Sequence, residues 1–470
     1  MAISYLSTRG EAPLLGFADV LLAGLARDGG LYLPVTWPRL GGDAIAGFAG
    51  RPYIEVAAAV IGPYVEEPLR NALREMIAAA YAGFRHPAVT PLVQTGPNEF
   101  LLELFHGPTL AFKDVAMQLL ARLMDRALEA RGERATIVGA TSGDTGGAAI
   151  EAFRGRDRVD VVILHPHGRV SEVQRRQMTT VAAPNVHAVA VEGTFDDCQA
   201  LVKAMFNDHR FRDRHRLAAV NSINWARIVA QAVYYFVAAA ALGGPGRAVS
   251  FAVPTGNFGD VFAGWVAKRM GLPVGRLLVA TNSNDILARA LASGRYETTG
   301  VVPTTSPSMD IQVSSNFERL LFEATGRDAA AVRAAMARLA QSGAFDIAAP
   351  TLAAMRAELD AARVDEAEAA ATIRALRAES GYLADPHTAV AVAASRKVAG
   401  DPAVPRVVLA TAHPAKFPDA VEAATGERPA LPPHLADLFA RPERLSVVAN
   451  DLAAVENFVA ERSRAAREAA

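Results

Sequence analysis

The feature that most constrains the fold is the alternation of short, almost wholly apolar runs with longer amphipathic segments. The run ATIVGAT, from Ala135, ends in a glycine-rich turn, and the small-residue segment TGGAAIEAF follows it. The runs VDVVILHP, VHAVAVEG and AVSFAVP repeat this pattern. Strands that are apolar along their whole length belong to parallel sheets that helices cover on both faces. The sequence therefore predicts an α/β fold.

The length of the chain and this alternation of apolar and amphipathic segments predict three structural parts. With 470 residues, the chain is too long for one ordinary core. We expect a small N-terminal domain over residues 1–90 and an α/β core over residues 91–420. The core should hold a parallel sheet that helices cover on both faces, with a helix-rich insertion at about 325–380. Residues 421–470 are expected to form a helical tail.

Composition and charge exclude several classes of protein. Hydrophobic residues make up 51% and charged residues 21%, which is typical of a globular chain. The net charge of −1 gives no basic surplus for nucleic acid or anionic membranes. The longest apolar stretch, from Ile228, contains Gln231 and is expected to be a buried helix. The single cysteine, Cys198, excludes an internal disulfide and fits a cytoplasmic protein.

A lysine in apolar surroundings is the first sign of chemistry. The stretch FHGPTLAFKDVAMQ, from Phe105, places Lys113 just behind a glycine-proline turn and at the start of an apolar helix. A lysine that only solvated the helix would lie on its polar face. Because burial disfavours the charged form, we expect Lys113 to have a lowered pKa and to act as an amine.

Three strand ends carry residues suited to ligands. ATSGDTGGAA, from Ala140, and PTGNFGD, from Pro254, each follow a strand and open a helix, where free N–H groups and the helix dipole favour an anion. The glycines of the second motif permit the close approach that a phosphate requires. Thr411, in LATAHPAKF, ends a strand at the edge where α/β sheets bind ligands. Taken singly, these patterns also fit capped turns and an ordinary strand residue.

The loop NSINWARI, from Asn221, is a further candidate anion site. It supplies two amides, a hydroxyl and Arg227. An arginine with small polar donors suits a dianion such as phosphate, although the pattern also describes a helix cap beside a solvated arginine. The histidines, among them His165, His167 and His387, lack metal-ligand spacings, so we expect structural roles for them and no metal site.

Together these features form one apparatus: a desolvated lysine, a phosphate cradle, a hydroxyl at a strand end and an anion-binding turn. Pyridoxal phosphate requires these parts. The lysine would hold its aldehyde as a Schiff base, and the cradle would hold its phosphate.

The motifs resemble those of the threonine synthase family. FHGPTLAFKD, ATSGDTGGAA, NSINWAR, PTGNFGD and ATAHPAKF occur in order, with the similar phrases YLSTRG, EGTFDDCQ and DPHTAV. The resemblance runs from residue 4 to about 420 and is to the branch found in bacteria and fungi. It implies a fold-type II, tryptophan synthase β-like fold, in which the core holds two doubly wound open sheets in two subdomains. It also implies a carbon–oxygen lyase acting on phosphates. The implied reaction, the last step of threonine biosynthesis, converts O-phospho-L-homoserine and water to L-threonine and phosphate by γ-elimination and β-addition of water.

The resemblance also implies roles for individual residues. The cofactor-binding residues are then Lys113 as the catalytic Schiff-base lysine, Asp144 near the ring 3′ oxygen, Gly256, Asn257, Phe258 and Gly259 at the cofactor phosphate, and Thr411 at the pyridine nitrogen. The substrate-binding residues are Thr141, Ser142 and Thr145 at the α-carboxylate, and Asn221, Ser222 and Arg227 at the substrate phosphate. Relatives in the wider fold type often have asparagine in place of Asp144. Lys416 is a further candidate for the substrate phosphate.

Two other functions remain open. A threonine-synthase-like phospholyase would use the same lysine but release phosphate and 2-oxobutyrate. A non-catalytic phosphometabolite-binding protein would have the same doubly wound fold. A γ-phosphate requires a second phosphate site, and PTGNFGD and NSINWAR supply two candidates. We expect a monomer or homodimer with no nucleic-acid or membrane partner.

Overall fold

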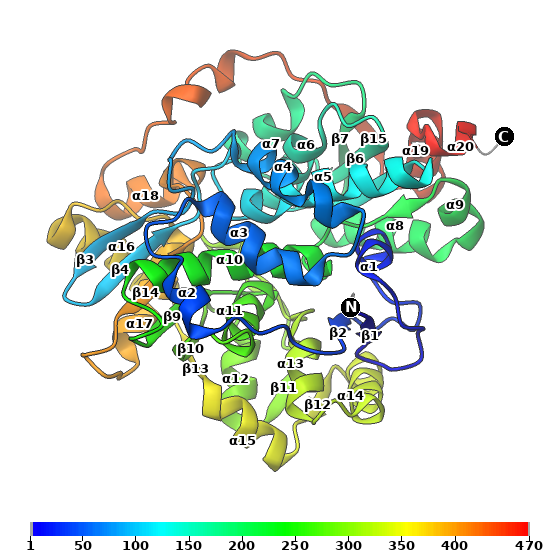
Figure 1. The fold of residues 1–470 in the computed structure, drawn as a ribbon. Coiled ribbons are helices and arrows are strands. Elements are labelled where there is room, and N and C mark those ends of the chain that lie inside the picture. The colour runs from blue at the N-terminus through cyan, green and yellow to red at the C-terminus, as the bar shows by residue number, and fades with distance from the viewer. Residues whose placement is uncertain (1–2, 469–470) are drawn as a thin grey trace.

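Two open sheets with helices on both faces form the frame of the computed structural model, which describes residues 3–468 (Figure 1). In spatial order, the first sheet consists of β13 (Leu359–Arg363), β10 (Val274–Thr281), β9 (Val249–Pro254), β14 (Arg406–Ala410), β4 (Glu99–Glu103) and β3 (Leu92–Gly96). All its strand pairs are parallel except β3–β4, which is antiparallel. The predicted α/β fold is thus confirmed.

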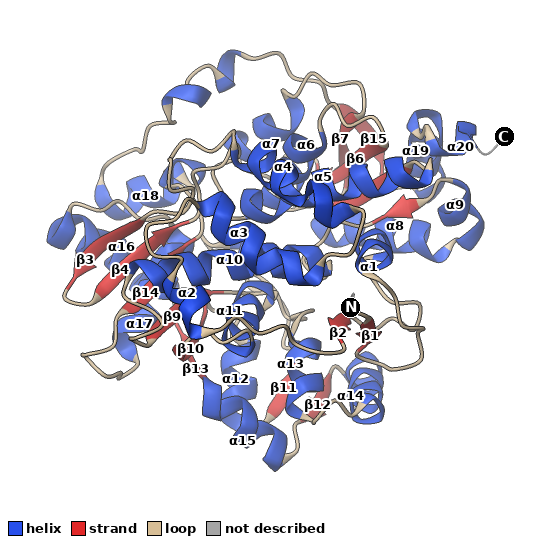
Figure 2. Ribbon diagram, viewed as in Figure 1, coloured by secondary structure: helices blue, strands red, loops and turns tan. Residues whose placement is uncertain are grey.

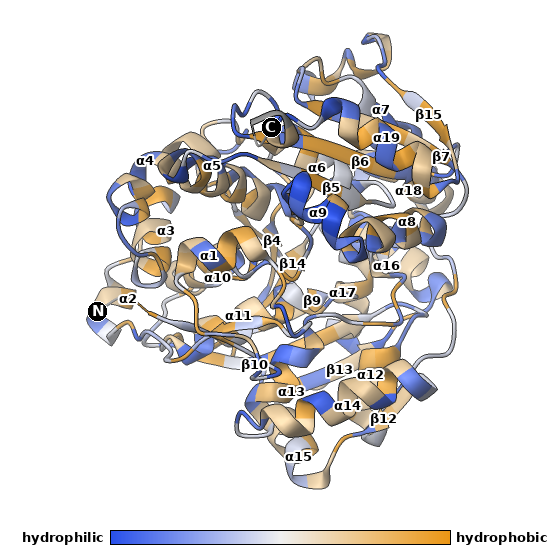
Figure 3. Cartoon of the chain, turned by 90° about the vertical axis from the view of Figure 1, so that its right-hand side faces the viewer, coloured by the Kyte–Doolittle hydropathy of each residue, from blue (hydrophilic) through white to orange (hydrophobic). Residues whose placement is uncertain are grey.

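The second sheet is parallel throughout. Its strands, in spatial order, are β15 (Ser446–Ala449), β7 (Val186–Glu192), β6 (Val159–Pro166), β5 (Ala135–Ala140) and β8 (Leu217–Ala218). Every residue of β6 is buried, and the hydropathy colouring shows this strand as largely apolar (Figure 3). Both faces of β6 are covered, which explains why apolar and polar residues do not alternate along its sequence.

A row of four packed helices connects the two sheets. In order of contact, they are α6 (Asp144–Phe153), α5 (Lys113–Arg131), α10 (Trp225–Ala241) and α11 (Gly259–Arg269). Since α6 follows β5 and α11 follows β9, the row places the two glycine-rich turns at its opposite ends. Helix α10 is the predicted buried helix, with Ile228 and Gln231 both buried. Between residues 3 and 468, no helix combines the length and hydropathy needed to cross a bilayer.

The remaining helices of the core lie around the two sheets and the row of helices (Figure 2). They are α7 (Glu172–Thr179), α8 (Phe195–Asn207), α9 (His209–Arg214), α12 (Ile286–Ser293), α13 (Phe317–Ala324), α14 (Ala329–Ser342), α15 (Ala349–Glu358), α16 (Glu366–Ser380) and α17 (Pro386–Lys397). The expected insertion at about 325–380 contains α14, α15 and α16 but also two strands. One is β13, and the other is β12 (Ala344–Asp346), which pairs with β11 (Arg295–Glu297).

The N-terminal segment shares its core with α10. Its elements are β1 (Tyr5–Ser7), α1 (Phe17–Ala23), β2 (Tyr32–Pro34), α2 (Gly42–Ala46), α3 (Tyr53–Ile61) and α4 (Leu69–Tyr81). The rings of Tyr5 and Tyr64 lie 6.1 and 5.7 Å from the ring of Trp225, the first residue of α10. Aromatic burial of this kind fixes α10 against the N-terminal segment.

The C-terminal segment is not helical throughout, contrary to the expectation for residues 421–470. After α18 (Pro418–Thr425) the chain runs over the top of the molecule in Figure 1 and forms β15. β15 pairs with β7 because the edge of a sheet presents unpaired N–H and C=O groups, and SVVA supplies β-branched residues to cover them. The helices α19 (Leu452–Arg462) and α20 (Ala465–Glu468) follow.

Candidate functional site

Lys113 begins α5, directly beside the end of β14. The N–H of Phe112 donates to the carbonyl of Thr411 at 2.8 Å, and Ala111 forms an isolated β-bridge with Ala412. Two residues singled out in the sequence, Lys113 and Thr411, are therefore brought together. Both are buried, with 7% and 5% of their surfaces exposed.

The amine of Lys113 has two polar neighbours. Its Nζ lies 3.3 Å from Oδ2 of Asp144 and 3.2 Å from Oγ of Ser308. Burial lowers the pKa of Lys113, and the positive charges of Lys416 and Arg227 lower it further, whereas Asp144 opposes the shift. The pKa of Lys113 thus moves in the direction that its apolar surroundings predicted.

Asp144 is the hub of the polar cluster. Besides Lys113, its Oδ2 accepts a hydrogen bond from Ser308 Oγ at 3.1 Å. Its Oδ1 lies 3.0 Å from both Lys416 Nζ and Gln174 Nε2. Burial alone would raise the pKa of Asp144, but Lys416, Lys113 and Gln174 together hold it well below its usual range. Asp144 is therefore a carboxylate between two lysines.

The turn before Asp144 leaves anion-binding groups free. The hydroxyl of Thr141 accepts hydrogen bonds from the N–H groups of Gly143 and Gly146, so it caps α6. Gly143 has φ 141°, which only glycine adopts readily. Within the described chain, the N–H groups of Asp144 and Thr145 make no hydrogen bond, and neither do the side chains of Ser142 and Thr145. The substrate contacts of Thr141, Ser142 and Thr145 stay predictions.

The motif PTGNFGD forms a cradle at the start of α11. Phe258 adopts a left-handed conformation with φ 62°, and its N–H donates to Thr255 Oγ1 at 3.0 Å. The N–H groups of Gly256, Asn257 and Gly259 find no backbone or side-chain acceptor among residues 3–468. A Cβ on Gly256 would lie 3.0 Å from the side chain of Ile311, so a larger residue would crowd the cradle. Free N–H groups at a helix N-terminus are suited to a phosphate.

Arg227 lies at the start of α10, and Asn224 caps that helix. Arg227 is 3% exposed, its Nη1 donates to the carbonyl of Val220 at 3.2 Å, and its buried Nε has no partner in the described part of the chain. Burial lowers the pKa of Arg227 to about 10, so the guanidinium remains a cation at neutral pH. A buried cation with an unsatisfied donor is a site for an anion.

A single asparagine joins the two candidate phosphate sites. Nδ2 of Asn316 donates to the carbonyl of Ser222 at 3.2 Å and to the carbonyl of Asn257 at 3.1 Å. Ser222, from the loop before α10, therefore lies next to the cradle. Asn221 is exposed, and its predicted contact with the substrate phosphate stays a prediction.

Several residues of the cluster were not predicted. Ser308 lies in the 3₁₀ helix η2 (Pro307–Met309), and its N–H donates to Nε2 of His387 at 3.4 Å. Nδ1 of His387 lies 2.7 Å from Asp385, which also caps α17. The motif DPHTAV contained this pair but gave no sign of its partner. Lys416, a further candidate for the substrate phosphate, instead has its ammonium group 3.0 Å from Oδ1 of Asp144.

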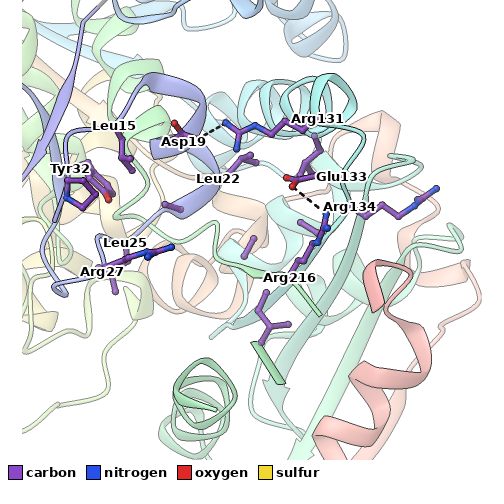
Figure 4. Close-up of a pocket in the computed structure, with 16 residues that line it drawn as sticks. Leu15, Asp19, Leu22, Leu25, Arg27, Tyr32, Arg131, Glu133, Arg134 and Arg216 are labelled. Carbon is purple, nitrogen blue, oxygen red and sulfur yellow. Dashed lines mark hydrogen bonds and ion pairs between the residues drawn. The ribbon is translucent and has the colours of Figure 1, made fainter. Parts of the chain in front are cut away.

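A separate cavity lies at the opposite end of the second sheet. It has a volume of about 650 Å³ and is lined by residues where β5 and β8 begin (Figure 4). Two ion pairs join charged side chains of its lining: Arg131 lies 2.6 Å from Asp19, and Arg216 lies 3.6 Å from Glu133. Since no lysine is among its described lining residues, the cluster around Lys113 is the candidate site.

Comparisons with known proteins give consistent matches along the whole chain. The family model for the threonine synthase N terminus matches residues 4–81, that for pyridoxal-phosphate dependent enzymes matches residues 84–357, and that for the C-terminal part of threonine synthase matches residues 388–459.

Individual relatives cover nearly the full length. The threonine synthase of Pseudomonas aeruginosa is 54% identical over 97% of this chain and 98% of its own. The crystal structure of pyridoxal-phosphate-bound threonine synthase from Brucella melitensis is 62% identical, with a TM-score of 0.97 over 98% of this chain and 100% of its own. Threonine synthase from yeast is 40% identical, with a TM-score of 0.93 over 98% of both chains.

Proposed function

The chain belongs to the threonine synthase family of pyridoxal-phosphate-dependent enzymes, and we propose that it converts O-phospho-L-homoserine and water to L-threonine and phosphate. The observation that carries this proposal is the second anion site. Arg227 is a buried guanidinium with an unsatisfied donor, and Asn316 links Ser222, in the loop before its helix, to Asn257 of the glycine cradle. Two phosphates, one of the cofactor and one of the substrate, require two such sites.

The residues present fit the cofactor. Free N–H groups at Gly256, Asn257 and Gly259 would hold its phosphate together with Phe258, whose left-handed backbone shapes the cradle. Thr411 would contact the ring nitrogen, Asp144 would approach the ring 3′ oxygen, and Lys113 would hold the aldehyde. When bound, pyridoxal phosphate supplies an aldehyde that captures amines and a ring that withdraws electrons from the substrate α-carbon.

The other side chains would then orient the substrate. We assign its α-carboxylate to the N-terminus of α6, with Thr141, Ser142 and Thr145, where N–H groups are free. We assign its phosphate to Arg227 with Asn221 and Ser222. Departure of phosphate from the γ-carbon is assisted where positive charge meets the leaving oxygen, which is the role of the Arg227 guanidinium.

Lys113 would move the proton at the α-carbon. The lowered pKa of Lys113 increases the fraction of its side chain that is a neutral amine, the form that can accept a proton. Ser308 accepts a hydrogen bond from Lys113 Nζ and so aims the amine, and the carboxylate of Asp144 stabilises the charge after the proton arrives.

We further propose a cytoplasmic monomer or homodimer that binds neither nucleic acid nor membranes. Its formal net charge of −1 provides no attraction to either polyanion, and its single cysteine, Cys198, is buried and free. Light scattering of the purified protein measures the oligomeric state.

The test combines a spectrum, a mapped modification and product analysis. The purified protein should absorb in the band of a lysine-bound cofactor, and borohydride should fix the cofactor on Lys113. In a separate sample that has not been treated with borohydride, O-phosphohomoserine should yield threonine and phosphate in equal amounts. Formation of 2-oxobutyrate without threonine would make the protein a phospholyase, and absence of the absorption band would make it a non-catalytic binding protein.

A further inference from the structure

Lys416 is a fully buried lysine in the wall of the site. It ends the 3₁₀ helix η3 (Pro414–Lys416) and has 0% of its surface exposed. Its Nζ donates to the carbonyl of Thr109 at 2.7 Å and to Oε1 of Gln177 at 2.9 Å, and it lies 3.0 Å from Oδ1 of Asp144. These three partners use the donors of the ammonium group, so no donor is left for a phosphate.

The two buried lysines share one carboxylate. The chain has five lysines, and the two that are buried, Lys113 and Lys416, both lie beside Asp144. Two ammonium groups and one carboxylate would leave a net positive charge in a dry site, which is costly. The cost is avoided if one lysine is neutral. Lys416, with a carbonyl and an amide oxygen as further acceptors, is the better stabilised cation.

Four other titratable groups interact electrostatically with the lysines or the carboxylate of the cluster. Arg227 is the other cation that acts on Lys113, and His387 acts on Asp144. Burial raises the pKa of Asp114 and of Asp260 to about 6 in each case, and hydroxyl groups bind both carboxyls. Thr109 Oγ1 donates to Asp114 at 2.6 Å, and Tyr235 Oη donates to Asp260 at 3.0 Å. Neither carboxyl pairs with Lys113 or Lys416 in the described structure.

We propose that Lys416 is a positioning residue that neutralises Asp144 and thereby leaves Lys113 free to lose its proton. Without Lys416, the charge of Asp144 would be matched by Lys113 alone, which would then be held as an ammonium group. An ammonium can neither attack an aldehyde nor accept a proton. The inference rests on the proposed function only in taking Lys113 as the reactive lysine.

The test measures the pKa of Lys113 in the full-length protein after the cofactor has been removed and shown to rebind. Trace acetic anhydride labels each lysine in proportion to its free amine, and mass spectrometry of the peptides gives a titration curve for each. Exposed Lys203 serves as the internal reference. The variants are Lys416→Met, Asp144→Asn and the double variant, with Lys397→Met as the control for loss of a lysine elsewhere.

Lys416→Met should raise the pKa of Lys113 by about one unit or more, since a lone carboxylate within 4 Å favours the ammonium form. Asp144→Asn should lower it, and the double variant should return it to within a few tenths of a unit of the wild-type value. In the holoenzyme, the acidic limb of the kcat/KM profile of Lys416→Met should move to higher pH. An unchanged pKa of Lys113 in Lys416→Met would overturn the proposal and leave Lys416 a structural residue.

A second comparison keeps the proposal testable if the Lys416→Met variant misfolds. If Lys416→Met does not fold, the difference between Asp144→Asn and the double variant still isolates the charge of Lys416. The pKa of Lys113 should be higher in the double variant, and equal values would overturn the proposal. Because the readout uses protein without cofactor, it is independent of the product formed, so a failure of the proposed reaction is seen separately.

Discussion

The side-chain nitrogen of Lys113 lies 3.2 Å from the hydroxyl of Ser308, although 195 residues separate them in the chain. Ser308 also makes two further hydrogen bonds. Its hydroxyl donates to Asp144 at 3.1 Å, and its backbone N–H donates to His387, which Asp385 holds through Nδ1. The segment carrying Ser308 is thus fixed by α17 while it aims the amine of α5.

Removal of this hydroxyl should slow turnover. In Ser308→Ala, the Lys113 amine loses one of its two polar neighbours. We expect kcat to fall by about 10- to 100-fold, which is at or below the lower end of the roughly 10²- to 10⁴-fold that a positioned acid or base contributes, because Ser308 only positions the amine. KM should change little because Ser308 is not assigned a substrate contact. Steady-state kinetics measure both constants, and Ser293→Ala, on the surface, is the control. A raised KM with kcat unchanged would assign Ser308 to substrate binding instead.

Replacement of the reactive lysine itself should be far more damaging. Lys113→Ala should retain its far-UV circular dichroism but lose several orders of magnitude in threonine formation, on the order of what removing a covalent catalyst costs. Lys203→Ala provides the matched surface control. Turnover of Lys113→Ala within tenfold of wild type would exclude Lys113 as the reactive residue.

Arg227 should act on the substrate phosphate and not on the cofactor. Loss of a buried guanidinium that pairs with a phosphate should lower kcat/KM by about 10²-fold or more, which corresponds to at least 2–3 kcal/mol. In Arg227→Met, the amount of cofactor bound should be unchanged, and competitive inhibition by inorganic phosphate should weaken. Arg210→Met, at an exposed position, is the control. Loss of cofactor with intact phosphate inhibition would assign Arg227 to the other site.

Stability should depend on pH through Asp260. Burial raises its pKa to about 6 from an ordinary value of 3.8, and the hydrogen bonds from Tyr234 and Tyr235 only partly offset this rise. Between these pH values the folded state binds a proton that the unfolded state does not, so the contribution of Asp260 to stability falls as pH rises from about 4 to about 6. Above about pH 6, the contribution of Asp260 to stability no longer changes with pH.

The variant Asp260→Asn removes this dependence. Its free energy of unfolding relative to wild type should therefore improve as pH rises from 4 to 7, by up to about 3 kcal/mol for a shift of two units. Urea unfolding at a series of pH values measures the difference, with exposed Asp157→Asn as the control. A difference that is independent of pH would show that Asp260 titrates normally.

The sequence predicted those residues of the candidate site that lie in recognisable local motifs. Lys113, the Asp144 turn, the cradle at Gly256 and Thr411 all lie at strand ends or helix starts, where backbone geometry restricts the residue types. Ser308 and Asn316 lie in an irregular segment without periodicity, so nothing local marks them. Their roles arise only when that segment folds over the cradle, where Ser314 Oγ donates to the carbonyl of Gly256 at 2.5 Å.

The same limit applies to pairings between distant segments. The apolar runs predicted the strands of both sheets, but not that β15 would extend the second sheet, because SVVA is short and surrounded by polar residues. The contact of Lys416 with Asp144 also could not be predicted from the residues next to Lys416 in the sequence. A lysine after HPA gives no sign of whether it faces a phosphate or a carboxylate until three other segments surround it.

The position of β14 in the first sheet has a consequence for the order of folding during synthesis. β14 (Arg406–Ala410) lies between β9 and β4, so β4 leaves the ribosome about 300 residues before its neighbour. Until then, the nascent chain exposes the facing edges of β4 and β9, where other chains can pair. Lys113 likewise cannot take its place beside Thr411 until the segment after β14 has been synthesised. A truncated product that lacks residues 406–470 would therefore be inactive and prone to aggregate. A chaperone that shields the gap between β4 and β9 would raise the yield of active protein.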